Sequence, residues 1–501
     1  FFTATDENGI RTFPVAAFEP NYASVFVQDK FKYKDIIFRL GLRVDRFDSN
    51  TKVLKDPYSL YEVIGASDFH GQADVIAERP GNIGDDFKVY TTDANSNEVQ
   101  AYRDGDIWYF PDGTQANNGS EIYGSQLVFP RYTAENPDIQ AEGFDTDITF
   151  DDYEPQINVM PRLAFSFPIS DEANFFAHYD VLVQRPPSNS FVNPSRYYYW
   201  GQSGLRNNAN LLPEKTIDYE IGFQQKLSNS SAIKLTAYYK ELRDMIQARF
   251  YFQVDGLGEY ETFDNLDFGT VKGFSASYDL RRTGNVQLNV AYTLQFADGT
   301  GSDSESSRST GTKTIVRVLS PLNFDERHRL VINLDYRYGS GKQYNGPKIG
   351  GVEIFSNTGL NMQYSTVSGR PYTREKDVTA EFTGNGTVGS INGSRLPWTQ
   401  TLNLRVDKSF TLTKPGATRP LNMNVYFRVS NLLDARNIIN VYNATGSPTD
   451  DGWLVSPLGQ NRAATFDARA QSYLDSYQTR VLNPDFYSLP RRMYIGMQFD
   501  F

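Results

Sequence analysis

Four adjacent aromatic residues, Tyr197, Tyr198, Tyr199 and Trp200, lie within a long polar segment and are candidates for a binding site. Stacked rings offer rigid contact area at a low cost in conformational entropy, which suits sugars, flat chelates or peptides. Tyr and Trp also gather where a membrane meets water, so an aromatic belt at a membrane rim is the alternative interpretation. The sequence leaves both interpretations open.

A second set of candidates consists of charged residues that alternate with apolar residues in two extended segments. They are Arg39, Arg43, Asp45, Arg405 and Asp407. An arginine that faced lipid at the centre of a bilayer would cost about 2–4 kcal/mol. We therefore expect these five side chains to face a water-filled lumen and not lipid.

Residues for covalent chemistry are few. The three histidines, His70, His178 and His328, are far apart in the sequence, and a structural or interfacial role is favoured for them. No HExxH or G-x-S-x-G motif occurs. The segment Gly339–Lys342 resembles part of a phosphate-binding loop, but Tyr336 and Gln343 occupy positions that such a loop needs for glycine and Ser/Thr. The sequence predicts no enzymatic activity and no cofactor.

Four acidic residues, Asp145, Asp147, Asp151 and Asp152, form a cluster that a hard cation such as calcium could use. The spacing of an EF-hand is missing, and a solvated acidic loop is the simpler interpretation. We predict no metal site, although calcium in the loops stays open.

Composition narrows the class of protein. The chain has 501 residues, a net charge of -11 and no cysteine, so nucleic acid is not an expected partner and disulfides are impossible. It is rich in aromatic residues, with 32 Tyr and 35 Phe, yet no segment approaches the roughly 18–20 apolar residues of a membrane-spanning helix. A β-barrel can still cross a membrane, because its strands interleave lumen and lipid positions. The chain begins at Phe1 without a leader, so we expect a fragment or a processed product.

Alternation of apolar and polar residues recurs along the chain. In the segment from Ile36 to Asp45, Ile36, Phe38 and Leu40 fall on one side of an extended strand, and Arg39, Arg43 and Asp45 on the other. The same period predicts about thirteen strands of a length suited to crossing a bilayer. They lie near 22–33, 36–48, 157–167, 174–184, 215–227, 232–241, 268–281, 286–297, 328–338, 352–366, 399–410, 421–431 and 491–501.

The connections between these strands alternate in length. Short turns alternate with long polar segments at 49–156, 185–214, 297–325, 367–397 and 434–489. This asymmetry is typical of outer-membrane barrels, which have short periplasmic turns and long extracellular loops. Segments 87–90 and 107–110 predict small hairpins within the first long loop. Pro161 lies inside a predicted strand, so we expect it near a membrane edge or a bulge.

Several of these segments resemble TonB-dependent outer-membrane receptors. They are Ser24–Lys30 with Leu40–Asp45, Leu212–Gly222 with Ala237–Tyr239, Ser368–Thr373, Val429–Asp434 and the last strand. Their order over nearly the whole chain resembles receptors of the Bacteroidota type, which carry a carboxypeptidase-like regulatory domain upstream. The resemblance implies an all-β transmembrane antiparallel barrel. Residues 1–501 would be its C-terminal portion, about the last thirteen of twenty-two strands, with 49–156 as a large extracellular loop.

The resemblance also implies function and partners. The expected function is active import of a nutrient across the outer membrane of a Gram-negative bacterium, through a plug domain and the periplasmic energy-coupling protein TonB. By this resemblance, we expect the plug and the first strands to belong to a part that precedes this chain. The five charged residues described above would then pair with the plug or line the pathway. Outer-membrane lipid and lipopolysaccharide would surround the barrel, and a surface lipoprotein is a further partner that the resemblance allows. The outer-membrane insertion machinery would recognise Tyr494, Gly496, Phe499 and Phe501.

Two other classes of function remain as alternatives. One is a structural or adhesive barrel that binds partners through its loops without transport. The other is an outer-membrane protease or lipase, for which the sequence shows no catalytic set.

Overall fold

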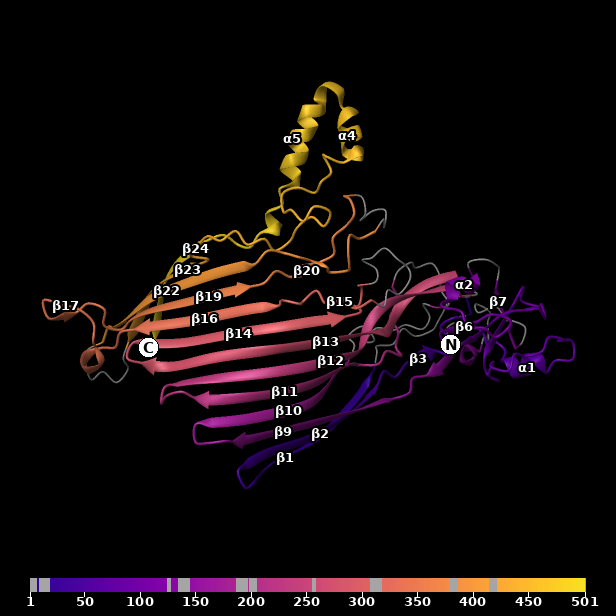
Figure 1. Ribbon diagram of the computed structural model, residues 1–501, viewed down its shortest axis with the longest axis horizontal. Coiled ribbons are helices and arrows are strands. Elements are labelled where there is room, and N and C mark those ends of the chain that lie inside the picture. The colour runs from indigo at the N-terminus through magenta and orange to yellow at the C-terminus, as the bar shows by residue number, and fades with distance from the viewer. Residues whose placement is uncertain are drawn as a thin grey trace.

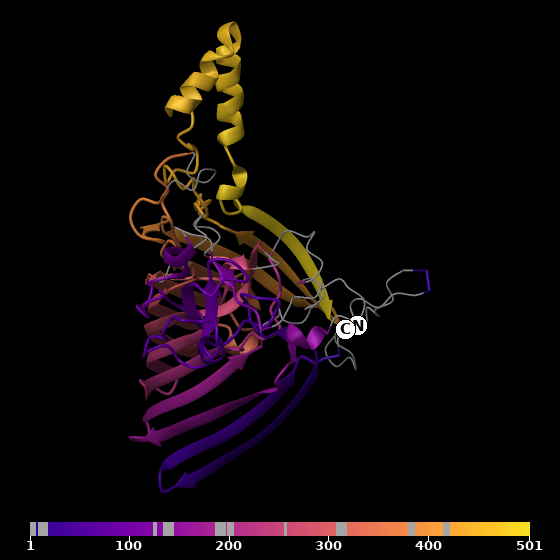
Figure 2. The ribbon, with the colours of Figure 1, turned by 90° about the vertical axis from the view of Figure 1, so that its right-hand side faces the viewer.

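One large antiparallel sheet dominates the computed structural model of the chain (Figure 1). The structure describes residues 7–8, 19–123, 128–133, 145–185, 197, 205–254, 258–306, 318–378, 386–413 and 421–500. The sheet has 14 strands, and each neighbour in its main path is the next long strand along the chain, from β1 to β24. Figure 2 shows that the sheet is strongly curved. The all-β transmembrane barrel predicted from the sequence is confirmed.

The thirteen strands of the main path correspond to the thirteen predicted ones. Their bounds are β1 Asn21–Tyr33, β2 Ile36–Asp48, β9 Gln156–Pro168, β10 Ala173–Gln184, β11 Glu214–Lys226, β12 Ser231–Val254, β13 Gly258–Thr283, β14 Val286–Gly299, β16 His328–Arg337, β19 Thr358–Val367, β22 Thr399–Thr411, β23 Asn422–Ser430 and β24 Arg492–Asp500. The short strand β15, Ser320–Pro321, pairs with β14 beside the path.

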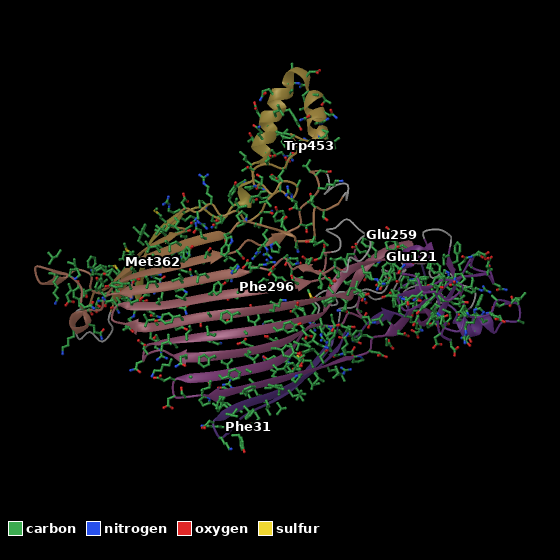
Figure 3. The ribbon with its side chains drawn as sticks, viewed as in Figure 1. Phe31, Glu121, Glu259, Phe296, Met362 and Trp453 are labelled. Carbon is green, nitrogen blue, oxygen red and sulfur yellow. The ribbon has the colours of Figure 1, made fainter. Side chains whose placement is uncertain are left out.

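The register aligns the two-residue period of neighbouring strands, so the sheet has one apolar face and one polar face. Directly paired residues share a face. Across three strands, for example, Leu294 pairs with Phe274 and His328, whereas Gln295 pairs with Gly273. Figure 3 labels Phe296 of β14 and Met362 of β19, which both belong to the apolar face. A sheet with one continuous apolar face suits lipid outside and water inside.

The connections at the two ends of the sheet differ as predicted. At one end, tight turns join β1 to β2, β9 to β10, β11 to β12 and β13 to β14. At the other end lie the long connections from β2 to β9, β10 to β11, β14 to β16, β19 to β22 and β23 to β24. The ladder between β9 and β10 ends at Arg162, so the missing N–H of Pro161 costs no bond on that side. No bulge accompanies Pro161, because β9 pairs with β2 without a register shift.

Strands β12 and β13 are much longer than the predicted segments 232–241 and 268–281. They contain 24 and 26 residues and continue as a paired hairpin beyond the point where β11 ends its pairing at Arg243. The register shifts near Met245, next to Asp244 with φ 57°, allow the hairpin to bend. This extension reaches the loop end of the molecule (Figure 1).

The segment between β2 and β9 folds into small sheets of its own. The predicted hairpins at 87–90 and 107–110 are found as β4 Lys88–Thr91 and β6 Ile107–Tyr109, joined through β5 Val99–Asp104 and completed by β7 Phe129–Pro130. The other elements are β3 Lys52–Leu54, paired with β8 Phe150–Asp152, and the short helices α1 Ala66–His70, α2 Gly119–Tyr123 and η1 Thr146–Ile148. We call this folded segment the loop layer.

The connection from β23 to β24 contains two helices that the sequence did not predict. They are α4 Pro457–Ala464 and α5 Ala470–Val481, which project as a pair above the sheet (Figures 1 and 2). The remaining short elements of the described residues are η5 Gly341–Gln343, β17 Lys348–Ile349, β18 Val352–Glu353, β20 Pro371–Tyr372, β21 Ser394–Arg395, η6 Asp467–Arg469 and η7 Pro484–Phe486. Among the described residues, no helix combines the length and apolar character needed to cross a membrane.

Candidate functional site

The polar face of the sheet holds the charged residues singled out in the sequence. Arg39, Arg43 and Asp45 all lie on this face of β2. Arg43 donates from Nε to Asp45 Oδ1 over 2.7 Å and from Nη2 to the Tyr22 hydroxyl over 2.8 Å. The Tyr22 hydroxyl in turn donates to Asp45 Oδ2 over 2.6 Å. Arg39 is exposed on the same face, so its guanidinium is accessible to a partner in the lumen.

Arg405 and Asp407 belong to a second polar group on β22. Asp407 is 5% exposed and accepts two hydrogen bonds from Arg337, over 2.9 and 3.1 Å, and one from Asn424 over 3.2 Å. Gly359 of β19 lies between Arg337 and Asp407 in the register. A Cβ atom at this glycine would clash with Arg337 Nη2, so the missing side chain lets the arginine cross the strand. The Arg405 guanidinium packs 4.4 Å from the centre of the Tyr426 ring.

A third charged group on the polar face was missed in the sequence. Arg162, Asp180, Asp218 and Lys240 are successive partners in the registers of β9, β10, β11 and β12. Lys240 Nζ donates to Asp218 over 2.8 Å, and Arg162 lies 3.4 Å from Asp180. The sequence could have shown that these four residues face the lumen, because each occupies a polar position in a strand of alternating polar and apolar residues. Their alignment could not be seen without the register.

The last strand places its candidate residues on both faces. Tyr494 and Gly496 lie on the polar face, where Arg428 covers the Tyr494 ring at 4.9 Å and Tyr426 packs over Gly496. Phe499 lies on the apolar face and is 52% exposed. Phe501 lies outside the described residues. Recognition by the insertion machinery stays a prediction.

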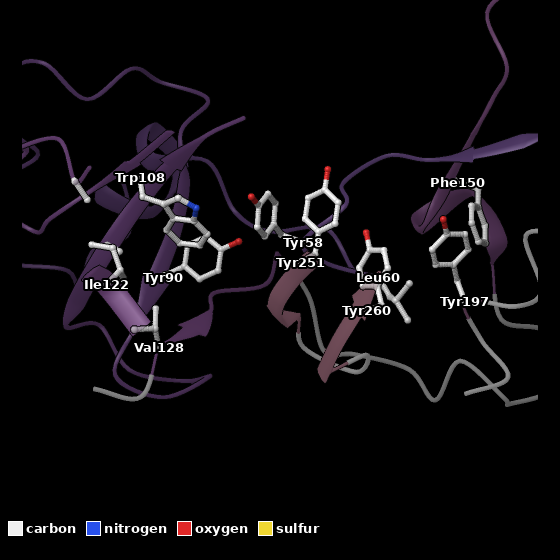
Figure 4. Packing of buried hydrophobic residues seen from close by; sticks show 12 residues of the cluster. Tyr58, Leu60, Tyr90, Trp108, Ile122, Val128, Phe150, Tyr197, Tyr251 and Tyr260 are labelled. Carbon is white, nitrogen blue, oxygen red and sulfur yellow. The ribbon is translucent and has the colours of Figure 1, made fainter. Parts of the chain in front are cut away.

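The aromatic segment at 197–200 is described only at its first residue. Tyr197 is 7% exposed and packs against Phe150 and Tyr260 in the core between the loop layer and the extended hairpin (Figure 4). Tyr198, Tyr199 and Trp200 lie outside the described residues, and their role as ligand contacts stays a prediction. Tyr197 is therefore a core residue in this structure, and its ring is covered by Phe150 and Tyr260.

That core contains two arginines within a cluster of tyrosines, which we call the Arg–Tyr cluster: Arg103, Arg249, Tyr58, Tyr90, Tyr251 and Tyr260. Arg249 of β12 donates two hydrogen bonds to Asp106 of the loop layer, over 2.6 and 2.7 Å, and one to Asp264 over 2.9 Å. The Tyr260 hydroxyl donates to the Pro57 carbonyl over 2.6 Å. These bonds fasten the loop layer to the hairpin.

The Arg–Tyr cluster combines cations with aromatic rings. The Arg103 guanidinium lies 4.5 Å from the Tyr58 ring centre, and that of Arg249 lies 4.4 Å from the Tyr251 ring centre. Arg103 also pairs with Asp56 and donates to the Tyr90 hydroxyl over 2.9 Å. Burial raises the pKa of Tyr58 to about 12, because a phenolate would be costly in this dry environment. The same cause raises the pKa of Tyr90 and Tyr251.

Lysines neutralise part of the acidic cluster at 145–152. Lys52 lies 3.0 Å from Asp147 and 3.1 Å from Asp152, and Lys55 lies 3.5 Å from Asp151. Hydrogen bonds to Asp147 and Asp152 raise the pKa of Lys52. Asp145 accepts a backbone hydrogen bond at the start of η1. No cluster suited to a metal ion occurs among the described residues.

The three histidines lie in separate places. His70 contacts the Tyr102 hydroxyl over 2.8 Å in the loop layer. His178 lies 3.6 Å from Glu220 on the polar face. His328 contacts the Tyr292 hydroxyl over 2.9 Å and stacks on Trp398, on the apolar face near the loop end. The interfacial role expected for His328 agrees with this aromatic group.

A cavity lies where the connection after β23 returns toward β24. Its volume is about 520 Å³, within the range of small-ligand sites. The lining includes Asp434, Arg436, Leu482, Asn483 and Tyr487.

Residues 3–432 match the family model described as TonB dependent receptor-like, beta-barrel. None of the curated proteins compared with the chain matches it.

Several solved structures are similar to the chain. The ferric-catecholate import receptor Fiu from Escherichia coli K12 is 12% identical, with a TM-score of 0.40 over 84% of this chain and 41% of that chain. The outer membrane transporter YddB from Escherichia coli is 11% identical, with a TM-score of 0.44 over 84% of this chain and 51% of that chain. The hemophore receptor HasR from Serratia marcescens, solved with its hemophore HasA and heme, is 13% identical, with a TM-score of 0.41 over 84% and 49%. The present chain thus spans about half the length of these proteins or less.

Proposed function

Since the chain belongs to the TonB-dependent receptor β-barrel family, we propose that the complete protein imports a nutrient ligand across the outer membrane of a Gram-negative bacterium. The observation that carries this proposal is the polar face, which continues through the successive strands of the main path from β2 to β24. Once the barrel is closed, such a face lines a lumen wide enough for a mobile domain or a solute.

The proposed mechanism uses binding and movement, without covalent chemistry. The ligand binds among the loops, and a plug domain inside the lumen blocks its passage until TonB transmits energy from the inner membrane. Arg39 is exposed on the polar face, and Arg43 and Arg405 are part of its charged groups. We propose that these arginines pair with acidic residues of the plug, because an exposed guanidinium can exchange one carboxylate partner for another at small cost.

The proposed domain arrangement follows the family. Residues 1–501 form the C-terminal portion of the barrel, about the last thirteen of twenty-two strands. The plug, the first strands and, in the Bacteroidota type, a carboxypeptidase-like regulatory domain belong to the preceding part. Residues 49–156 form a large extracellular loop, and a surface lipoprotein is a further proposed partner at the barrel mouth.

Ligand recognition is proposed for the aromatic segment and its neighbours. The buried packing of Tyr197 supports a role in holding this segment against the loop layer. Contact with the ligand is assigned to Tyr198, Tyr199 and Trp200, whose flat faces suit sugars, chelates and peptides alike. Tyr494, Gly496, Phe499 and Phe501 are proposed to serve the insertion machinery.

A second candidate function is adhesion without transport. The helix pair α4 and α5 projects away from the sheet and would offer a surface to partners outside the cell (Figure 2).

Uptake measurements on cells separate the two functions. A deletion strain is first grown on a panel of scarce nutrients to find the one it can no longer use, and the uptake of that labelled nutrient is then followed in the complemented strain. For a transporter, a protonophore abolishes uptake and leaves surface binding intact. Surface binding without any uptake identifies the adhesive barrel, and unchanged growth of the deletion strain on every nutrient argues against import.

A further inference from the structure

The connection between β16 and β19 differs from the tight turns at the same end of the sheet. Residues 338–357 contain η5 and the two-stranded hairpin formed by β17 and β18, in which Ile349 pairs with Val352. Both side chains are strongly exposed, Ile349 by 68% and Val352 by 64%. The turn between β13 and β14 carries polar residues and glycine at its tip, and the turns after β9 and β11 each expose one apolar side chain, Ile169 and Leu227, whereas this hairpin exposes two that are paired.

A two-residue turn closes the hairpin between β17 and β18. Gly350 and Gly351 have φ of 56° and 81°, as a two-residue hairpin turn with two left-handed positions requires. Lys348 and Glu353 pair across the strands at 3.3 Å. Because directly paired residues share a face, Ile349 and Val352 form one small apolar surface next to the glycine turn.

Contacts place this connection on the apolar side of the sheet. Tyr336 belongs to the apolar face of β16, and Tyr338 next to it stacks on Phe355 at 5.8 Å. Lys408 pairs with Val425 on the apolar face of β22 and donates to the Ile354 carbonyl over 2.5 Å. These contacts hold the base of the connection against the apolar face of the sheet, and Figure 1 shows the hairpin itself just beyond the turn end of the sheet.

The residues around the β17–β18 hairpin are aromatic residues and lysines, which are common at membrane interfaces. Tyr336, Tyr338, Tyr344 and Phe355 form an aromatic group in which Phe355 is 43% exposed. Tyrosine rings settle at the level of lipid headgroups, where one end is apolar and the other is wet. Lys342 and Lys348 lie close by and can reach lipid phosphates with their long side chains.

We propose that the β17–β18 hairpin is a membrane anchor that inserts Ile349 and Val352 into the glycerophospholipid leaflet at the turn end of the barrel. The hairpin fixes the depth of the barrel at this rim, as a short amphipathic element lying in the interface would. The proposal requires a sheet that spans the membrane, but it does not depend on transport.

Spin labelling tests the depth of the hairpin directly. These 501 residues contain no cysteine, so Ile349→Cys adds the one labelling site in this part of the protein. Any cysteine in the preceding part is replaced by serine before the full-length protein is labelled and reconstituted in vesicles of phosphatidylethanolamine and phosphatidylglycerol. The lipid control is Met362→Cys on the apolar face, and the water control is Asn229→Cys in the exposed turn between β11 and β12. Collision rates of the label with oxygen and with a water-soluble nickel chelate report its depth.

Insertion predicts that nickel collisions at position 349 fall by about threefold or more below those at position 229, with oxygen collisions close to those at position 362. Val352→Cys should give the same result, which guards against a local effect of one substitution. A nickel collision rate at both positions nearer to that of position 229 overturns the proposal. That outcome would leave the tip free in water, as expected if it docks on a periplasmic protein.

Discussion

Single glycines on the polar face allow polar side chains from the two flanking strands to contact each other. Gly359 is a clear case, since the side chain of Arg337 passes over it to reach the buried carboxylate of Asp407. Gly273 serves the same purpose for Tyr238, whose hydroxyl reaches Gln295 on the third strand over 3.3 Å. A missing side chain on the middle strand therefore links residues two strands apart.

Gly359→Ala should lower the free energy of unfolding by about 1–2 kcal/mol, because the new methyl group displaces Arg337 and leaves Asp407 without its main partner. Urea unfolding of the full-length protein in lipid vesicles measures this change.

Gly41→Ala is the matched control on the same face. Its Cβ would meet nothing closer than 3.6 Å, so this substitution should be close to neutral. Equal effects of the two substitutions would mean that the Arg337–Asp407 pair contributes little.

Each long strand presents opposite chemistry on its two faces, and β16 illustrates this well. Ile332 lies on the apolar face between two aromatic groups, with His328 and Trp398 toward the loop end and Tyr336 toward the turn end. Roughly 26 Å of strand separates His328 from Tyr336 at about 3.3 Å per residue. Ile332 is therefore close to the centre of the lipid-facing band.

Ile332→Arg should destabilise the folded protein in vesicles by about 2–4 kcal/mol, because a guanidinium at mid-depth meets hydrocarbon. Asn333→Arg, one residue further along, points to the polar face beside Asn289 and Gln363 and should be tolerated. Unfolding in urea compares the two. A similar loss for both variants would contradict the assignment of the faces.

Alternation of polar and apolar residues predicts the long strands but not the other elements. All thirteen long strands could be predicted, because each keeps its two-residue period across the membrane. The extensions of β12 and β13 could not, since the period is interrupted near Asp244, where the backbone bends. The helices α4 and α5 were also missed, because their sequences are mostly polar and lack a broad apolar stripe.

At the scale of the molecule, the Arg–Tyr cluster joins two parts that are far apart in the sequence. Arg249 and Asp106 are 143 residues apart, and Tyr260 and Pro57 are 203 residues apart. The sequence offered the residue types but no means of pairing them, because Asp106 and Pro57 lie outside the main sheet and no strand register relates them to β12 and β13. This is why the polar face could be predicted in outline and the attachment of the loop layer could not.

The tyrosines of the Arg–Tyr cluster predict that alkali releases the loop layer. The pKa of Tyr58 in the folded protein is about 12, above its ordinary value of 10.0. A raised tyrosine pKa favours the neutral form, so its contribution to stability is complete below pH 10.0 and is lost as the pH rises toward 12. The fluorescence of Trp108, which is buried in the same core, should change over this interval.

Trp108→Phe identifies that signal, and the emission of Trp398, which lies on the sheet, should change little. A transition centred near pH 10 would show that the fold does not hold these phenols neutral, and no transition in strong alkali would contradict the release of the loop layer by their ionisation.

The long hairpin of β12 and β13 has a mechanical consequence. Eleven residues of β12, Asp244 to Val254, continue past its last partner on β11, which corresponds to roughly 35 Å of extended strand. This strut is continuous with the barrel wall and carries the loop layer at its far end. A force applied to the loop layer would therefore be transmitted to the barrel wall through β12 and β13.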